Sequence, residues 1–213
     1  MALFEFNQVH FKTILSIDHI QIKTHEITAI IGKSGAGKTT FLHLLNKMLS
    51  PTEGTILFKE KSLSEIDTVS HRKKVPLLSQ KPFLFASTIY DNFKRVASIH
   101  QIPLSNEKIE HLLEQVNIDK PLDHRVKPLS SGEAQRIAIA RIMYIDADVI
   151  LLDEPSSALD DLTEEAVIKY IVDYVKKSNK SLIMVTHSKT IAKKYADRVL
   201  EIKDKAIKEV NYD

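Results

Sequence analysis

The sequence contains no cysteine and only five glycines among its 213 residues. Without cysteine the chain cannot form disulfides or thiolate metal sites, which fits a reducing cytosol. Glycine usually makes up about 7% of a protein, and four of the five here fall in two short loops, at Gly32, Gly35, Gly37 and Gly132. We therefore look for function in those two loops.

Long apolar runs are also missing. A membrane-spanning helix needs about 18 consecutive apolar residues, and no such run occurs; the N-terminus also lacks the basic start and apolar stretch of a signal peptide. Lysine and arginine total 30 against 28 aspartates and glutamates, and this net charge of +2 argues against a dedicated nucleic-acid-binding surface. With 43% hydrophobic and 27% charged residues, the chain has the composition of one large globular domain, or of a core with a subdomain grown from it.

Short apolar runs alternate with amphipathic segments along the chain. The runs Glu26–Ile31, Val149–Leu152 and Leu182–Thr186 are typical of strands buried on both faces of a parallel sheet. Further strands are expected at 55–59 and 75–79, and helices from the end of the first glycine loop to Ser50, around 109–116, over 133–145 and over 161–175. This alternation predicts an α/β fold with a parallel sheet.

The first glycine loop reads Gly-Lys-Ser-Gly-Ala-Gly-Lys-Thr and fits the pattern G-x-x-x-x-G-K-[ST] between a predicted strand and a predicted helix. Its glycines let successive backbone N–H groups turn toward a phosphate, Lys38 supplies a point charge, and the Thr39 hydroxyl can ligate Mg²⁺. The alternative is a glycine-rich turn between two core elements. The residues expected to bind the nucleotide in this phosphate loop are Gly32, Lys33, Ser34, Gly35, Ala36, Gly37, Lys38, Thr39 and Thr40.

Two acids, Asp153 and Glu154, come at the carboxyl end of a predicted strand, where α/β sheets bind ligands. Asp153 would hold Mg²⁺, directly or through water. Because neighbouring residues on a strand point to opposite faces, Glu154 need not share the metal and could polarise a water for attack on the terminal phosphate. The alternative is a pair of acids in a solvated turn before Pro155.

Taken in order, these motifs resemble the nucleotide-binding subunit of ABC transporters. After the phosphate loop come Gln80, the signature loop Leu129–Glu133 (LSSGE), the two acids, the segment 156–160 (SSALD) and His187, and the match spans about residues 3 to 203. The resemblance implies a P-loop NTPase (RecA-like) parallel-sheet core with an N-terminal antiparallel β subdomain and an inserted helical subdomain. The core would take about 1–82 and 146–213, and the helical subdomain about 83–145.

The same resemblance implies roles for individual residues. The catalytic residues would be Gln80, Glu154 and His187. The metal ligands would be Thr39, Gln80 and Asp153. The residues that meet the ATP held by the opposite subunit would be Ser130, Ser131, Gly132 and Glu133. Gln80 would also link the site to a membrane partner, and segment 156–160 would contact the opposite subunit. Taken alone, Gln80 could simply cap a strand and His187 could be structural.

Two positions depart from the family pattern. The family signature reads Leu-Ser-Gly-Gly-Gln, whereas Ser131 replaces the first glycine here and Glu133 replaces the glutamine. If the backbone at Ser131 required a positive φ, serine would be mildly strained there. Many relatives place a tyrosine on the adenine near the N-terminus; the nearest aromatic here is Phe11, which either stacks on adenine or lies in the core.

For function, the resemblance implies an ATPase that binds Mg-ATP at the interface of a homodimer or of two paired ABC subunits. It would drive a separate integral membrane subunit and lie in the cytoplasm at the inner face of the cell membrane. The segment Gln80–Phe85, followed by Thr88, Ile89 and Asn92, resembles exporter-type ATPases, and the compact length resembles the FetA-like group of iron-export ATPases.

Two other functions stay open at this stage. A soluble ABC protein that acts on nucleic acid or ribosomes usually carries two cassettes or a long coiled-coil insertion, and this chain has neither. A nucleotide-binding module without turnover is disfavoured because both Glu154 and His187 are present. Pro82–Phe85 either belongs to the core of the helical subdomain or borders a groove that receives a helix from the membrane subunit.

Overall fold

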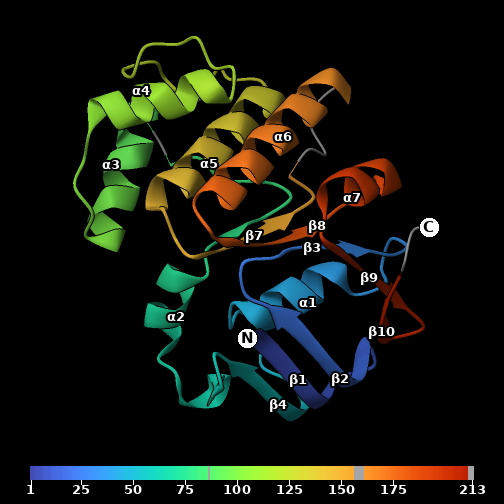
Figure 1. The fold of residues 1–213 in the computed structure, drawn as a ribbon. Helices are drawn as coiled ribbons and strands as arrows, with labels where there is room; N and C mark the ends of the chain where they lie inside the picture. Colours follow the sequence, from blue (N-terminus) through green and yellow to red (C-terminus); the bar gives the residue numbers. More distant parts are fainter. Residues whose placement is uncertain (86, 156–160, 211–213) are drawn as a thin grey trace.

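A computed structural model gives the fold of residues 1–85, 87–155 and 161–210, without the side chains of 161 and 162. Within these ranges the strands form two sheets, and helices cover both faces of the larger one (Figure 1). The larger sheet contains, in spatial order, β10 (Ala206–Glu209), β9 (Arg198–Lys203), β3 (Ile27–Ile31), β8 (Ser181–Val185), β7 (Val149–Asp153) and β6 (Leu77–Leu78).

The centre of this sheet is parallel, as the apolar runs predict. Strand β3 pairs in parallel with β8 and β9, and β7 pairs in parallel with β8 and β6. Among the described strand pairs of this sheet, only β9 and β10 are antiparallel. Every residue of β3, β7 and β8 is buried. A strand that is covered on both faces has no polar side to expose, which explains its unbroken apolar sequence.

Alternate residues of the central strands point into two separate apolar cores. In β7, Ile150 and Leu152 pack in the cluster formed with α5 and α6, whereas Leu151 packs in the cluster formed with α1 and the smaller sheet. Figure 1 shows α3 to α6 on one side of the sheet and α1 with the smaller sheet on the other.

The smaller sheet is the expected N-terminal antiparallel subdomain. It contains, in spatial order, β2 (Leu15–Lys23), β1 (Ala2–Phe11), β4 (Glu53–Phe58) and β5 (Lys61–Ser62). Its inner face packs on α1, where the rings of Phe6 and Phe41 stack with centroids 4.9 Å apart. This contact joins the subdomain to the helix that follows the phosphate loop.

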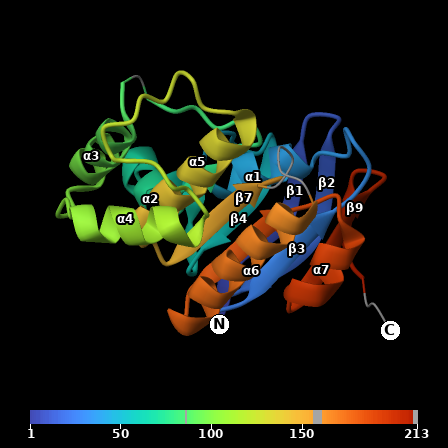
Figure 2. The same cartoon turned by 90° about the horizontal axis from the view of Figure 1, so that it is seen from above.

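The helices are α1 (Lys38–Leu45), α2 (Thr68–Lys74), α3 (Ile89–His100), α4 (Asn106–Gln115), α5 (Ser131–Ile145), α6 (Asp161–Lys177) and α7 (Lys189–Tyr195), with a 3₁₀ turn at Leu63–Glu65. Seen from above, α5 and α6 run side by side over the sheet (Figure 2). The group α3, α4 and α5 falls within the segment 83–145, whose boundaries as a helical subdomain stay a prediction. No helix in the described ranges is long and apolar enough to cross a membrane.

Two elements are shorter than predicted. The helix after the phosphate loop ends at Leu45 and not at Ser50, because Lys47 adopts a left-handed φ of 58° and the His71 ring bonds to the Leu45 carbonyl oxygen at 2.7 Å. The strand expected at 75–79 is reduced to the two residues of β6. For the helix, a contact and a backbone conformation beyond the apolar pattern determine where the element ends.

Candidate active site

Four neighbouring strands bring the candidate residues to one edge of the sheet. The phosphate loop follows β3, Asp153 and Glu154 lie at the end of β7, and His187 lies two residues after β8. Gln80 comes two residues after β6, the edge strand next to β7. Because these strands are parallel, their carboxyl ends meet at the same edge, where open α/β sheets bind ligands.

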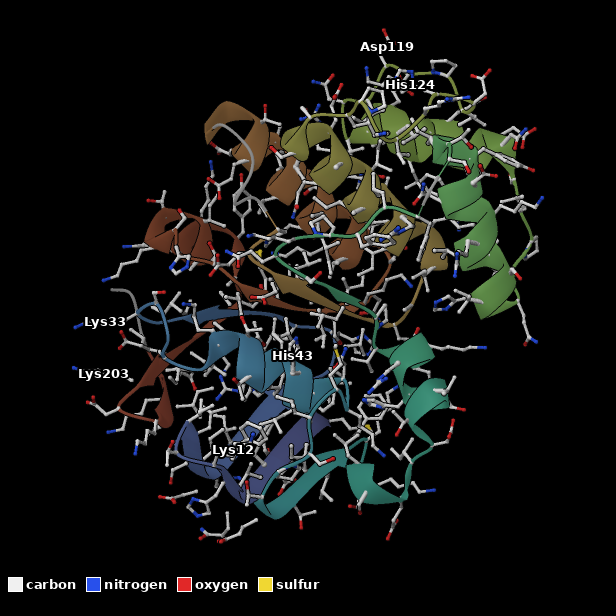
Figure 3. The ribbon with its side chains drawn as sticks, turned by 180° about the vertical axis from the view of Figure 1, so that it is seen from behind. Lys12, Lys33, His43, Asp119, His124 and Lys203 are labelled. Carbon is white, nitrogen blue, oxygen red and sulfur yellow. The ribbon has the colours of Figure 1, made fainter. Side chains whose placement is uncertain are left out.

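The phosphate loop requires glycine at two places for steric reasons. Gly37 has a φ of 102°, and a Cβ there would lie 2.9 Å from Leu15 Cδ2. A Cβ on Gly32 would lie 2.6 Å from the carbonyl oxygen of Ile202, so β9 also lies against the loop. Figure 3 shows Lys33 of the loop and Lys203 of β9 projecting from the same edge of the molecule.

The Lys38 ammonium lies inside the loop. The residue is only 5% exposed, and Nζ donates to the carbonyl oxygens of Gly32 at 3.0 Å and of Lys33 at 3.1 Å. Lys38 is also the first residue of α1, so the positive end of the helix dipole points at the same place. A phosphate in the loop would meet a buried cation and the N-terminus of a helix.

The residues of the predicted metal site fit Mg²⁺. The Thr39 hydroxyl donates to Oδ2 of Asp153 at 2.8 Å, and Oδ1 of Asp153 is buried without a hydrogen-bond partner. Burial raises the pKa of Asp153, and the nearby charge of Glu154 raises it further. The hydrogen bond from Thr39 and the charges of His43 and Lys38 oppose this shift. Figure 3 labels His43 on α1. A buried carboxylate with one unsatisfied oxygen, beside a hydroxyl, offers the oxygen ligands that Mg²⁺ prefers.

The structure brings Glu154, Gln80 and His187 together around one carboxylate. Gln80 Nε2 donates to Oε2 of Glu154, and His187 Nε2 contacts Oε1. The two neighbouring acids thus have different partners, since Asp153 faces Thr39 and Glu154 faces the glutamine and the histidine. In this arrangement Asp153 has one oxygen free for a metal, whereas both oxygens of Glu154 are bonded to side chains that could release it.

The signature loop opens α5 with a reciprocal cap. The Ser130 hydroxyl accepts from the Glu133 N–H at 3.2 Å, and the Glu133 carboxylate accepts from the Ser130 N–H at 2.8 Å. Lys120 pairs with Glu133 at 3.1 Å, and the Ser130 N–H and Lys120 together lower the pKa of Glu133. Ser131 is the first residue of the helix and has no positive φ, so the strain considered for serine does not arise.

Phe11 and the segment 156–160 leave two predictions untested. The Phe11 ring is 6% exposed in the core cluster of the smaller sheet, with Lys12 Nζ 5.4 Å from its centroid. The core alternative therefore accounts for this ring, and stacking on adenine stays a prediction. The segment 156–160 lies outside the described residues.

Sequence reasoning did not foresee the burial and bonding of two amides: Gln135 lies next to the site, and Asn92 holds the segment that follows Gln80. Gln135 of α5 is 1% exposed, and its Nε2 donates to the Pro155 carbonyl oxygen at 2.9 Å. Asn92 of α3 is fully buried and bonds to both the N–H and the carbonyl of Phe85. The signal for Gln135 was present in the sequence, because a polar residue four positions before Ile139 interrupts an otherwise apolar helix face.

A hollow of about 740 Å³ lies beside the segment that follows Gln80. Pro82, Phe83 and Leu84 line it together with Arg125, Val126 and Lys127. Phe83 is 72% exposed, whereas Phe85 is half-buried with the guanidinium groups of Arg95 and Arg141 4.5 and 4.9 Å from its ring centroid. Of the two aromatic rings expected at a partner surface, Phe83 is therefore the exposed one.

Comparison with known proteins identifies the family of this chain. The family model "ABC transporter" matches residues 15–157. The chain is 35% identical over 192 residues to ABC transporter I family member 17 of Arabidopsis thaliana, which covers 90% of this chain and 73% of the relative. It is 34% identical over 190 residues to the phosphate import ATP-binding protein PstB of Campylobacter jejuni. This match covers 84% of this chain and 76% of PstB.

A solved structure shows the same fold. CbiO1 from Clostridium perfringens, described as part of the ABC transporter complex CbiONQ, superposes with a TM-score of 0.82 at 26% identity, covering 97% of this chain and 87% of that one. The family match spans the phosphate loop, the signature loop and both acids. The chain therefore belongs to the ABC transporter family, as one of its ATP-hydrolysing domains with ATP and Mg²⁺ as ligands.

Proposed function

We propose that this chain powers transport through a separate membrane subunit, with Glu154 as the base that activates water. The observation that carries the proposal is the Glu154 carboxylate, 14% exposed and held by Gln80 and His187 beside the pair of Thr39 and Asp153. Hydrolysis of a terminal phosphate requires a base, a residue that orients water and a carboxylate that binds the metal.

Each residue of the site has one task in this mechanism. The phosphate loop and Lys38 bind the β- and γ-phosphates. Asp153 and Thr39 hold Mg²⁺, which when bound neutralises charge on the phosphates. Both oxygens of Glu154 are paired in the structure. When the γ-phosphate takes over the contact with His187, one carboxylate oxygen becomes free to accept a proton from water that Gln80 orients.

The signature loop serves the ATP of a second subunit, either another copy of this chain or a paired ABC subunit. Ser130 and Ser131 are exposed at the N-terminus of α5, where backbone N–H groups and the helix dipole favour a phosphate. Lys120 offsets the negative charge that Glu133 brings to this end of the helix. Two chains arranged head to tail would thus enclose two nucleotides.

The membrane subunit docks at the hollow around Phe83, through a short helix. An exposed aromatic ring beside a hollow is a typical anchor for a helix, and Arg125 and Lys127 supply charge at its rim. Docking there would hold the chain in the cytoplasm at the inner face of the cell membrane. The cargo we propose is a metal ion such as iron, moved outward, on the resemblance of the segment 80–92 to exporter-type ATPases.

One experiment tests the function and its alternatives together. The chain, expressed with a tag in its native cells, should copurify with an integral membrane protein and release phosphate from ATP. Copurification with ribosomes or nucleic acid instead would favour the soluble alternative, and ATP binding without phosphate release would contradict hydrolysis. For the cargo, vesicles with the membrane subunit should move iron; movement of phosphate, the substrate in PstB's name, would contradict that assignment.

A further inference from the structure

We propose that Gln135 is a positioning residue for Glu154, because it ties α5 to the turn that carries this base. The inference rests on the proposed role of Glu154. Gln135 is 1% exposed, and its Nε2 donates to the carbonyl oxygen of Pro155, the residue directly after Glu154, at 2.9 Å. The bond joins two segments 20 positions apart in the chain.

The turn at Glu154 needs such support. Glu154 has a φ of 49°, in the left-handed region that residues other than glycine rarely occupy. A residue persists in this region only where its surroundings hold it there. On the N-terminal side the Glu154 N–H donates to the Val185 carbonyl of β8 at 3.1 Å. On the C-terminal side Gln135 holds the carbonyl of Pro155, one residue beyond Glu154, so the chain is held on both sides of the base.

The amide of Gln135 is unusual for its place in α5. It lies on the same helix face as Ala138, Ile139 and Ile142, which are all buried. An amide buried without a partner is unfavourable, and methionine or leucine would fill the same space without that cost. Because Pro155 is also buried, its carbonyl requires a donor from within the protein, and Gln135 supplies one.

Positioning and simple stabilisation predict different results. If Gln135 only stabilises the fold, its loss lowers the melting temperature and leaves turnover per folded molecule unchanged. If it sets the carboxylate of Glu154, its loss lowers kcat while ATP affinity is retained, because the phosphate loop is intact. A displacement of about 1 Å in a catalytic group can reduce the rate by up to a hundredfold.

The test compares Gln135→Met with Tyr144→Phe in the purified full chain. Tyr144 is a matched control: it is buried in the same helix, and its hydroxyl donates to the carbonyl oxygen of Pro103 at 2.8 Å, far along α5 from the signature loop. Gln135→Met should lower kcat about ten- to a hundredfold with unchanged affinity for Mg-ATP. Tyr144→Phe should lower the melting temperature without changing kcat. Equal kcat in Gln135→Met and the unmodified chain would overturn the proposal.

A double-variant cycle shows whether Gln135 acts through Glu154. In the Glu154→Gln background, adding Gln135→Met should cause no further loss of turnover, because no base is left to misplace. Independent, additive losses would contradict positioning. If Glu154→Gln alone hydrolyses ATP normally, the proposed function fails; if it is inactive and Gln135→Met is normal, only this inference fails.

A third variant keeps the proposal testable should Gln135→Met fail to fold. Gln135→Glu has the same length, but its carboxyl group can donate to the Pro155 carbonyl only when protonated. Its kcat, relative to the unmodified chain at each pH, should therefore rise as the pH falls. A ratio that stays constant with pH would show that this hydrogen bond does not set the base.

Discussion

The phosphate site and the signature end of the molecule differ in how far their side chains are buried within one chain. Lys38 and Asp153 are 5% and 3% exposed, and both bond to other parts of the same chain. Near the signature loop, Ser130 and Ser131 are exposed at a helix N-terminus, and Phe83 beside the neighbouring hollow is 72% exposed. One region is assembled to hold a ligand by itself, and the other presents groups that only a second molecule would cover.

The strongest test of this comparison removes the proposed base, Glu154. Glu154→Gln keeps the side-chain volume but cannot take a proton, so turnover should fall by about a hundredfold or more while Mg-ATP binding survives. Because ATP then persists, the variant should form a dimer only when ATP is present, visible in size-exclusion chromatography. A variant that binds ATP and elutes as a monomer would contradict the head-to-tail arrangement.

A pair of substitutions separates the two regions directly. Lys38→Ala should weaken Mg-ATP binding by the isolated chain about ten- to a hundredfold, because a charged hydrogen-bond donor to the phosphates is lost. Gly132→Asp should leave that binding intact and abolish hydrolysis, because clash and like charge arise only against the ATP of the opposite subunit. Titration calorimetry measures Mg-ATP binding by both variants, and phosphate release measures hydrolysis. Loss of binding in Gly132→Asp would place the signature loop in its own chain's site.

The hollow offers a matched pair of aromatic rings. Phe83→Ala should leave the melting temperature unchanged and prevent copurification with the membrane subunit. Phe85→Ala should destabilise the isolated chain by about 1–2 kcal/mol, because a half-buried ring and its contacts with Arg95 and Arg141 are lost. A stable Phe83→Ala variant that still assembles would contradict docking at this surface.

The smallest effect concerns His71, which is buried where α2 meets the end of α1. Its Nε2 donates to the Leu45 carbonyl oxygen and its Nδ1 is unpaired, which describes a neutral ring. Burial lowers its pKa, with contributions from Lys47, Lys74 and Arg72, although the Leu45 bond opposes the shift. The folded state therefore binds a proton less readily than the unfolded state.

The sign of the pH dependence follows from that difference. The stability that neutral His71 contributes is fully present above its unfolded pKa of about 6.5 and is lost as the pH falls below it. His71→Phe should cost about 1 kcal/mol near pH 8, because the Leu45 carbonyl loses its donor, and should show a flatter decline toward pH 5. Urea unfolding at both pH values measures the difference. Parallel declines in the two proteins would contradict this role.

How much could be predicted from the sequence depends on how local each feature is. The phosphate loop was predictable because its glycines, Lys38 and Thr39 are contiguous and each meets a need of a bound phosphate. The α/β fold was predictable because a doubly covered strand is apolar throughout. The end of α1 was not, because it depends on His71, which belongs to a different helix. One partner of Phe85, Arg141, also comes from a distant segment, α5.

The sequence by itself determined the parallel core, the phosphate loop and the two acids, because periodicity and short-range spacing encode them. The remaining motifs and their order came from the resemblance to a family. Only the tertiary structure decided which residues meet. Gln80 reaches Glu154 across 74 positions of sequence because β6 and β7 are neighbours in the sheet, and Gln135 reaches Pro155 because α5 packs against the same strand end. Such contacts arise from strand order and helix packing, which no local pattern contains.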